Sequence, residues 1–202
     1  MTLDRFRPLA DRALGPFVSA ARMTGLSPNG VSVIAFLLAV AAGGVYGVAT
    51  RDPLLYLLGA VLVFANGWLD LVDGALAREL DVASSGGDLL DHVLDRYADI
   101  AIIVGLAAGI DRWALGIAAV TGVLMTSYLG TQAQAVGLDR VYGGVLGRAD
   151  RLALVGVVTG IAAFVQAQPA GLSLVGWLLV VFALVGHLTA VQRFYHSMRA
   201  LD

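Results

Sequence analysis

The chain has 202 residues, of which 58% are hydrophobic and 14% are charged, and its mean hydropathy is +0.82. This hydropathy is far above that of an ordinary soluble domain, and several apolar runs approach the roughly 20 residues that cross a bilayer as a helix. We therefore predict an all-α integral membrane protein, and we expect no nucleic-acid partner. Cysteine is absent, which excludes disulfides and thiolate metal sites.

The first 24 residues predict an amphipathic helix that lies on the membrane surface. Arg5, Arg7 and Arg12 alternate there with apolar residues, a pattern typical of interfacial helices. No apolar core follows directly, so the segment does not resemble a signal peptide. A frayed, soluble N-terminus is the alternative interpretation.

Six apolar segments follow between residues 28 and 196. Ser27 is a favourable helix cap and Pro28 a favourable first helical residue, so the first of these helices is expected to begin there. The predicted spans cover residues 31–50, 54–77, 89–110, 113–135, 151–168 and 172–190. We expect residues 1–202 to form one membrane-embedded domain, with six transmembrane helices plus the N-terminal interfacial helix. Glycines near Gly43 and Gly44 indicate close helix packing or a homodimer.

The arginines predict the orientation of these spans. Six spans place both termini on one side of the membrane, and all of the 13 basic residues except Arg51 and Arg112 then share that side. Because basic residues concentrate in cytoplasmic loops, that side is expected to be the cytoplasm. The sequence thus predicts a multi-pass cell-membrane protein whose termini and acidic region face the cytoplasm and contact membrane lipids.

The acidic region covers residues 70–95, between two apolar runs. A carboxylate near hydrocarbon is expensive, at about 2.5–3.5 kcal/mol on insertion scales, so a cluster needs compensating cations. Asp70 and Asp73 are three residues apart and Asp91 and Asp95 four apart, so each pair shares one helix face. A short connection predicts that the two helices are antiparallel neighbours with facing carboxylates. Oxygen ligands of this kind suit Mg²⁺ or Mn²⁺, and we expect a pair of ions.

Small and basic residues accompany the carboxylates. Gly74, Ala77 and Gly87 would let a bulky ligand approach the backbone closely. Arg78 can donate a bidentate pair of hydrogen bonds to phosphate. Together with the metals, these residues indicate a nucleotide or pyrophosphate at the membrane surface.

Further arginines lie nearby in the predicted cytoplasmic region. Arg140, Arg148 and Arg151 would suit a second substrate that carries a phosphate, and their alternative role is orientation or contact with lipid headgroups. Asp99, one turn deeper than Asp95, is expected either to belong to the site or to pair with Arg96 or Arg151.

The motif Asp70-x2-Asp73-Gly74-x2-Ala77-Arg78-x8-Gly87-x3-Asp91-x3-Asp95 resembles the signature of the CDP-alcohol phosphatidyltransferase family at all eight fixed positions. The element Ser27-Pro28-Asn29-Gly30 resembles a Thr-Pro-Asn-like element that the family commonly carries before its first span. The resemblance covers nearly the whole chain and implies the family's six transmembrane helices and N-terminal interfacial helix.

The resemblance also implies roles for individual residues. Asp70, Asp73 and Asp91 would hold one metal ion, and Asp70, Asp91 and Asp95 a second. Asp95 would also be the general base for the acceptor hydroxyl. The residues implied to bind the CDP-lipid are Ser27, Pro28, Asn29, Gly30, Gly74, Ala77, Arg78, Ser84 and Gly87.

The implied reaction belongs to phospholipid biosynthesis. A phosphatidyl-type or archaetidyl group would pass from a CDP-linked lipid to the hydroxyl of a small polar alcohol, with release of CMP. The chain looks most like archaeal members, whose donor is an ether-linked CDP-archaeol. The acceptor stays open between inositol phosphate and glycerol phosphate, because residues 128–134 lack the basic residues that follow a Tyr in members using inositol phosphate. A divalent-cation transporter and a non-catalytic lipid-binding protein are the alternatives.

Overall fold

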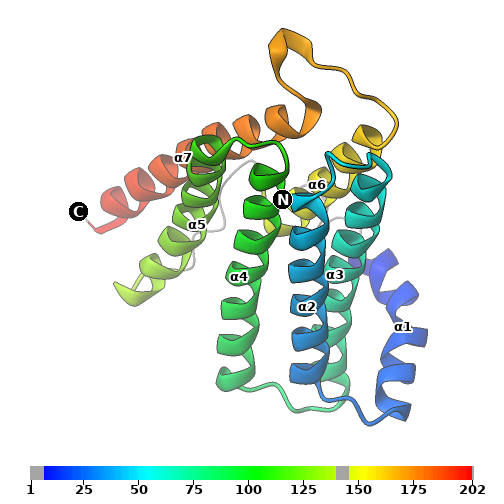
Figure 1. The fold of residues 1–202 in the computed structure, drawn as a ribbon. Coiled ribbons are helices and arrows are strands. Elements are labelled where there is room, and N and C mark those ends of the chain that lie inside the picture. Colours follow the sequence, from blue (N-terminus) through cyan, green and yellow to red (C-terminus); the bar gives the residue numbers. More distant parts are fainter. Residues whose placement is uncertain (1–6, 140–145, 202) are drawn as a thin grey trace.

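The computed structural model describes residues 7–139 and 146–201, which form helices and no strand (Figure 1). The helices are α1 (Arg7–Met23), α2 (Pro28–Gly47), α3 (Leu54–Glu79), α4 (Ser85–Gly109), α5 (Trp113–Ala135), α6 (Arg148–Ala162), the short 3₁₀ turn Pro169–Gly171 and α7 (Leu174–Leu201). The all-helical class predicted from the sequence is confirmed.

Four helices, α2, α3, α5 and α7, are long and apolar enough to cross a membrane. The other two predicted spans correspond to α4 and α6, which fall short for different reasons. Helix α6 has only 15 residues, and α4 carries Asp95, Arg96 and Asp99 along its length. Six long helices therefore follow α1 as predicted, whereas membrane crossing is supported by length and composition for four of them.

These six helices pack around a ring, in the order α2, α3, α6, α7, α5 and α4, and the last of them returns to α2. Helix α2 thus lies between α3 and α4, as Figure 1 shows. The prediction that α3 and α4 are close neighbours is wrong, because both pack on α2 and have little close contact with each other. Carboxylates of α3 and α4 nevertheless come within 4.8 Å of one another between the two helices.

One end of the ring is filled by an apolar core to which all six helices contribute. Tyr46, Ile102, Leu106, Leu179 and Phe182 are among its largest fully buried side chains. This core comes from the second half of α2 and α4 and the first half of α3, α5 and α7. The opposite end, which holds the 24–27 and 80–84 connections, is left for polar groups.

Glycines set the close approach of α2 and α4. A Cβ added at Gly105 would collide with the backbone of Gly43, and one added at Gly43 would collide with the carbonyl of Ala101. At the neighbouring Gly44 an added Cβ would meet nothing within 4 Å. Close helix packing, one of the two predicted roles of these glycines, is thus confirmed for Gly43.

Helix α1 lies against α3 at the edge of the ring (Figure 1). Leu14, Val18 and Ala21 are buried, while Phe17 packs its ring against Trp68 with centroids 5.3 Å apart. The predicted interfacial segment is therefore a helix over the part that the structure describes, 7–23. Its position on the membrane surface stays a prediction.

The helix ends agree with the sequence in one place and differ in two. The Ser27 side chain caps α2 by accepting a hydrogen bond from the Gly30 amide, as predicted. Ser84 caps α4 in the same way, so this helix begins at Ser85, before the predicted span 89–110. Helix α7 continues to Leu201, past residue 190 where the last predicted span ends.

Candidate active site

Three carboxylates from two helices form the centre of the polar end. Asp70 of α3 and Asp91 and Asp95 of α4 each offer one oxygen, and these oxygens lie within 4.8 Å of one another. All three side chains are partly buried. The helical spacing read from the sequence thus brings these three residues together across the gap between α3 and α4.

Asp73 lies beside this cluster and has a partner of its own. It is buried, with 6% of its surface exposed, and accepts a 2.6 Å hydrogen bond from the hydroxyl of Ser32 on α2. The prediction that four carboxylates converge is therefore correct for three, since Asp73 is outside the closest group and is bound to α2. Ser32 was missed by the sequence analysis, although it follows the capping element of α2 by one helical turn.

A guanidinium group bridges the carboxylate cluster. Arg148, the first residue of α6, places its Nη1 2.5 Å from Asp70 Oδ2 and its Nη2 2.7 Å from Asp95 Oδ1. Its side chain is 14% exposed, and its Nε is buried with no hydrogen-bond partner among the described residues. Arg148 was predicted to bind the acceptor, whereas in this structure it neutralises two predicted metal ligands.

A second set of ion pairs lies deeper in the bundle. The Arg151 Nη2 is 2.9 Å from Asp99, and both side chains are almost fully buried. Arg96 lies 3.5 Å from Asp95 and 3.6 Å from Asp99, and it also donates to the hydroxyl of Ser127. Of the two possibilities left open for Asp99, pairing with Arg96 or Arg151 is thus the one observed, and it involves both arginines.

The charges of this network do not balance once all carboxylates are included. Three aspartates and three arginines form the ion pairs, which makes that group formally neutral. Within the part of the chain that the structure describes, Asp73 and Asp91 make no ion pair. Their negative charges lie beside the neutral group and would attract a further cation.

The donor atoms fit a hard divalent cation. Carboxylate oxygens are the ligands that Mg²⁺ and Mn²⁺ prefer, and the cluster offers three of them from an arrangement held by two rigid helices. The residues present are therefore suited to an oxygen-ligated ion.

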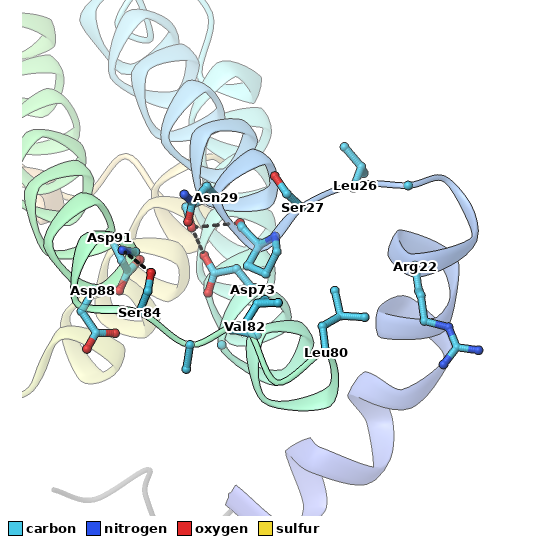
Figure 2. A pocket seen from close by; sticks show the side chains of 17 residues that line it. Arg22, Leu26, Ser27, Asn29, Asp73, Leu80, Val82, Ser84, Asp88 and Asp91 are labelled. Carbon is cyan, nitrogen blue, oxygen red and sulfur yellow. Dashed lines mark hydrogen bonds between the residues drawn. The ribbon is translucent and has the colours of Figure 1, made fainter.

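A pocket of about 590 Å³ opens on one side of the carboxylates. Figure 2 shows Ser27 and Asn29 at the start of α2, Asp73 from α3 and Asp91 from α4 around it. Seven of the nine predicted CDP-lipid residues line this pocket, namely Ser27, Pro28, Asn29, Gly74, Ala77, Ser84 and Gly87.

The two remaining predicted donor residues do not line the pocket. Gly30 donates its amide to the Ser27 cap, and a Cβ there would lie 3.3 Å from the Ser27 hydroxyl. Arg78 is exposed at the end of α3, with its Nη1 3.5 Å from the position of a Cβ at Gly74. The structure instead adds Leu80, Val82 and other residues of the α3–α4 connection to the pocket wall.

A second pocket, of about 680 Å³, has in its wall Arg148, the residue that bridges the carboxylates. Its charged wall consists of four arginines from three helices: Arg96, Arg148, Arg151 and Arg193. Ser127 and Thr131 of α5 add hydroxyl groups, and Tyr97 and Tyr128 add aromatic surface. Of the predicted acceptor residues, Arg148 and Arg151 therefore line a common pocket, while Arg140 lies outside the described residues.

Sequence reasoning missed Arg193 at this second pocket. It is buried, with 8% of its surface exposed, and its Nη1 donates a 2.6 Å hydrogen bond to the carbonyl of Thr126. The predicted end of the last span at residue 190 removed Arg193 from consideration as a bundle residue. Its position one turn after the buried Thr189 is a signal that could have revealed it.

Comparison with known proteins identifies this arrangement. A family model described as CDP-alcohol phosphatidyltransferase matches residues 25–189. The chain belongs to this family. The match spans the capping element, the carboxylate cluster and all residues that line the two pockets except Arg22 and Arg193.

Two curated relatives cover almost the whole chain. An archaetidylinositol phosphate synthase of Pyrococcus horikoshii is 27% identical, over 99% of this chain and 98% of its own. A phosphatidylinositol phosphate synthase of Mycolicibacterium smegmatis is 34% identical, over 91% of this chain and 82% of its own.

Solved structures agree with these relatives. A crystal structure of Mycobacterium tuberculosis phosphatidylinositol phosphate synthase with CDP-DAG bound is 28% identical and has a TM-score of 0.76, over 92% of this chain and 94% of that one. A second structure of that protein, in complex with manganese and citrate, also gives a TM-score of 0.76, with 29% identity over 92% of this chain and 88% of that one.

The family membership settles the class of activity. The chain is an enzyme, a CDP-alcohol phosphatidyltransferase of phospholipid biosynthesis. The transporter considered from the sequence is thereby set aside, and the intact motif gives no support to a non-catalytic relative.

Proposed function

We propose that this enzyme transfers a phosphatidyl-type or archaetidyl group from a CDP-linked lipid to a hydroxyl of inositol phosphate, with release of CMP. The observation that carries the proposal is that two pockets meet at one carboxylate cluster. Asp91 lines the first pocket, Arg148 lines the second, and Asp91 and Arg148 flank the same pair of carboxylates, Asp70 and Asp95. The names of the relatives, which are inositol phosphate-lipid synthases, support this acceptor.

The first pocket suits the CDP-lipid. Its volume of about 590 Å³ is in the range of a small-molecule site, and Gly74, Ala77 and Gly87 leave its wall free of large side chains. Ser27, Asn29 and Ser84 offer hydrogen-bonding groups for the cytidine and phosphate portions. We assign Arg78 and Gly30 supporting roles, at the rim and in the helix cap.

The second pocket suits an acceptor that carries a phosphate. Four guanidinium groups line this pocket and can donate hydrogen bonds to phosphate oxygens, which an uncharged alcohol such as free inositol lacks. Arg193 and Arg151 are held by Thr126 and Asp99, so their positions are fixed before the acceptor arrives.

The chemistry proceeds by attack at phosphorus. The acceptor hydroxyl loses its proton to Asp95, and its oxygen attacks the phosphorus on the lipid side of the pyrophosphate. The bond from that phosphorus to the bridging oxygen breaks, and CMP leaves with this oxygen. Asp95 is clustered with Asp91 of the first pocket and is paired with Arg148 of the second, which would bring the reacting groups close together.

Metal ions belong to this proposal as cofactors. Asp70, Asp73 and Asp91 would hold one Mg²⁺ or Mn²⁺, and Asp70, Asp91 and Asp95 a second. Bound ions of this kind neutralise pyrophosphate charge and acidify a coordinated hydroxyl. The manganese present in the mycobacterial relative's structure supports an ion of this class.

The membrane arrangement is part of the same proposal. Helices α4 and α6 would cross the bilayer together with the four more apolar helices, as one domain over residues 1–202 with α1 on the surface. Both termini and the active site would face the cytoplasm, where CMP is released, and two copies of the chain would form a homodimer.

The reaction is tested with purified enzyme, CDP-diacylglycerol or CDP-archaeol, and Mg²⁺ or Mn²⁺. CMP release is measured with inositol phosphate, glycerol phosphate, free inositol and serine as acceptors. We expect CMP release with inositol phosphate and one of the two donors. Release with glycerol phosphate alone, or with the unphosphorylated acceptors alone, would contradict the proposed acceptor.

A further inference from the structure

Arg148 lies at the junction of the two pockets and has two sets of possible partners. It bridges Asp70 and Asp95, both proposed metal ligands, at 2.5 and 2.7 Å. It also lines the arginine-rich pocket with Arg151 and Arg193. A single guanidinium therefore borders the ion site and the proposed acceptor site at once.

The local structure of α6 does not account for a cation at this position. Arg148 is the first residue of the helix, where a positive charge opposes the helix dipole. Its Nε is buried without a partner in the described part of the chain, so the ion pairs leave one donor of the guanidinium unsatisfied. The carboxylates of the site, and not the helix, therefore account for the placement of Arg148.

Divalent cations and Arg148 compete for the same carboxylates. Both proposed ions would use Asp70 and the second would also use Asp95, and the guanidinium neutralises these two carboxylates in this structure. A guanidinium left in contact with these carboxylates would also repel an ion bound beside it. Occupation of the cluster by metal therefore favours withdrawal of Arg148 from Asp70 and Asp95.

We propose that Arg148 is a positioning residue that exchanges partners, holding Asp70 and Asp95 before metal binds and the acceptor's phosphate afterwards. The second pocket already receives one side of this residue, so only the end of the side chain has to move. The guanidinium fork that fits two carboxylates also fits phosphate oxygens. The identity of the phosphate ligand rests on the proposed function. The competition between Arg148 and metal does not depend on it.

This exchange couples the two sites thermodynamically. Metal binding releases Arg148 toward the acceptor pocket, so metal should strengthen binding of the phosphate, and by linkage the phosphate should strengthen binding of metal. Before metal binds, the guanidinium compensates the clustered carboxylates. The enzyme would then bind its acceptor well only when its catalytic ions are present.

The first test measures Mn²⁺ affinity of the substrate-free enzyme in detergent, from the electron paramagnetic resonance signal of free Mn²⁺. We expect Arg148→Gln to lower the Mn²⁺ dissociation constant about tenfold, within the range usual for coupled sites, because the competing cation is gone. Arg193→Gln is the matched control, since it removes an arginine from the same pocket without touching Asp70 or Asp95, and should leave this constant unchanged. Unchanged or weaker Mn²⁺ binding in Arg148→Gln would overturn the exchange.

The second test measures inositol phosphate binding with and without Mn²⁺. The wild-type enzyme should bind it more tightly when Mn²⁺ is present, and Arg148→Gln should lose this gain. A full gain in Arg148→Gln would overturn the exchange, because the phosphate would then respond to metal without Arg148. The same titration with glycerol phosphate distinguishes the acceptor proposal from the exchange proposal. If Mn²⁺ strengthens binding of glycerol phosphate alone, inositol phosphate is not the acceptor, but the exchange of partners by Arg148 still holds.

Arg148→Lys keeps the test decisive if Arg148→Gln does not fold. Lysine retains the charge but is a compact point charge and cannot bridge two carboxylates as a fork does. We expect Arg148→Lys to tighten Mn²⁺ binding in the same direction, and Mn²⁺ to raise its melting temperature more than that of the wild type. A variant that matches the wild type in both measurements would overturn the exchange.

Discussion

The two pockets beside the carboxylate cluster, one lined by Asp91 and the other by Arg148, are built in different ways. The donor pocket comes from consecutive parts of the chain, the end of α1 and the helices α2, α3 and α4 with their connections. The arginine-lined pocket combines α4 and α5 with the first turn of α6 and the last turns of α7. One pocket is thus local in sequence, and the other depends on how distant helices close the ring.

This difference bears on how easily the ligand preference of each pocket can change. The donor pocket presents small residues and backbone to its ligand, and most of these residues belong to one sequence motif. The second pocket presents side chains whose positions depend on ion pairs and hydrogen bonds between helices, as with Arg151 to Asp99 and Arg193 to Thr126. We infer that the choice of acceptor can vary through the second pocket while the donor site stays the same.

The largest effect is expected where the two pockets meet. Asp95→Asn removes the proposed base and should lower turnover about 10²- to 10⁴-fold, measured as CMP release. Asp81→Asn is the matched control, because Asp81 is an exposed residue of the α3–α4 connection with φ +52°, a conformation that Asn also tolerates. Full turnover in Asp95→Asn would show that Asp95 is not the general base for the acceptor hydroxyl.

A substitution confined to the donor pocket should separate the two substrates. Ala77→Leu adds bulk to the wall of that pocket and should raise the KM for CDP-lipid about tenfold or more, with the acceptor KM unchanged. Gly86→Ala is the control, since a Cβ there meets nothing within 4 Å. An equal rise in both KM values would mean that the pockets do not act separately.

The reverse pattern is expected at the second pocket. Arg193→Gln removes a charge-assisted contact of about 1.5–3 kcal/mol and should raise the acceptor KM about tenfold, with the CDP-lipid KM unchanged. Arg199→Gln on the same helix is the control, because Arg199 is exposed and lies over the Tyr195 ring at 5.1 Å. A rise in the CDP-lipid KM alone would mean that Arg193 acts on the donor and not on the acceptor.

The smallest effect on catalysis is expected at the apolar end of the ring. Gly105→Ala places a Cβ against the backbone of Gly43 and should lower stability by about 1–3 kcal/mol, seen as a lower melting temperature in detergent. Gly44→Ala, which meets open space, should leave the melting temperature unchanged. Below the melting temperature both KM values should stay at wild-type levels, and a selective change in either would show that the core shapes that pocket.

The sequence predicted the donor half well because its evidence is local. Helical spacing alone brings Asp91 and Asp95 to one face of α4, and the Ser27 cap follows from residue type and a following proline. The relation of α3 to α4 was predicted incorrectly, because it depends on α2 packing between them. Asp73 likewise departs from the other carboxylates because of Ser32, a contact that no spacing within α3 contains.

The second pocket could be predicted only in part, because it depends on long-range packing. Arg148 and Arg151 were recognised as basic residues in a suitable region, but the bridge from Arg148 to Asp70 joins residues 78 positions apart. Arg193 was not predicted as a pocket residue because hydropathy falls before α7 ends. The helix nevertheless continues and carries this residue into the bundle. The absence of basic residues at the end of α5 is offset by arginines from α4, α6 and α7.

The central claim is that the arginine-lined pocket recognises the phosphate of the acceptor. It is tested most directly by comparing kcat/KM for inositol phosphate and for free inositol, in the wild-type enzyme and in Arg193→Gln. We expect the wild type to prefer inositol phosphate strongly, and Arg193→Gln to reduce this preference by lowering kcat/KM for inositol phosphate alone. An equal kcat/KM for the two acceptors in the wild type, or a preference that Arg193→Gln leaves unchanged, would contradict it.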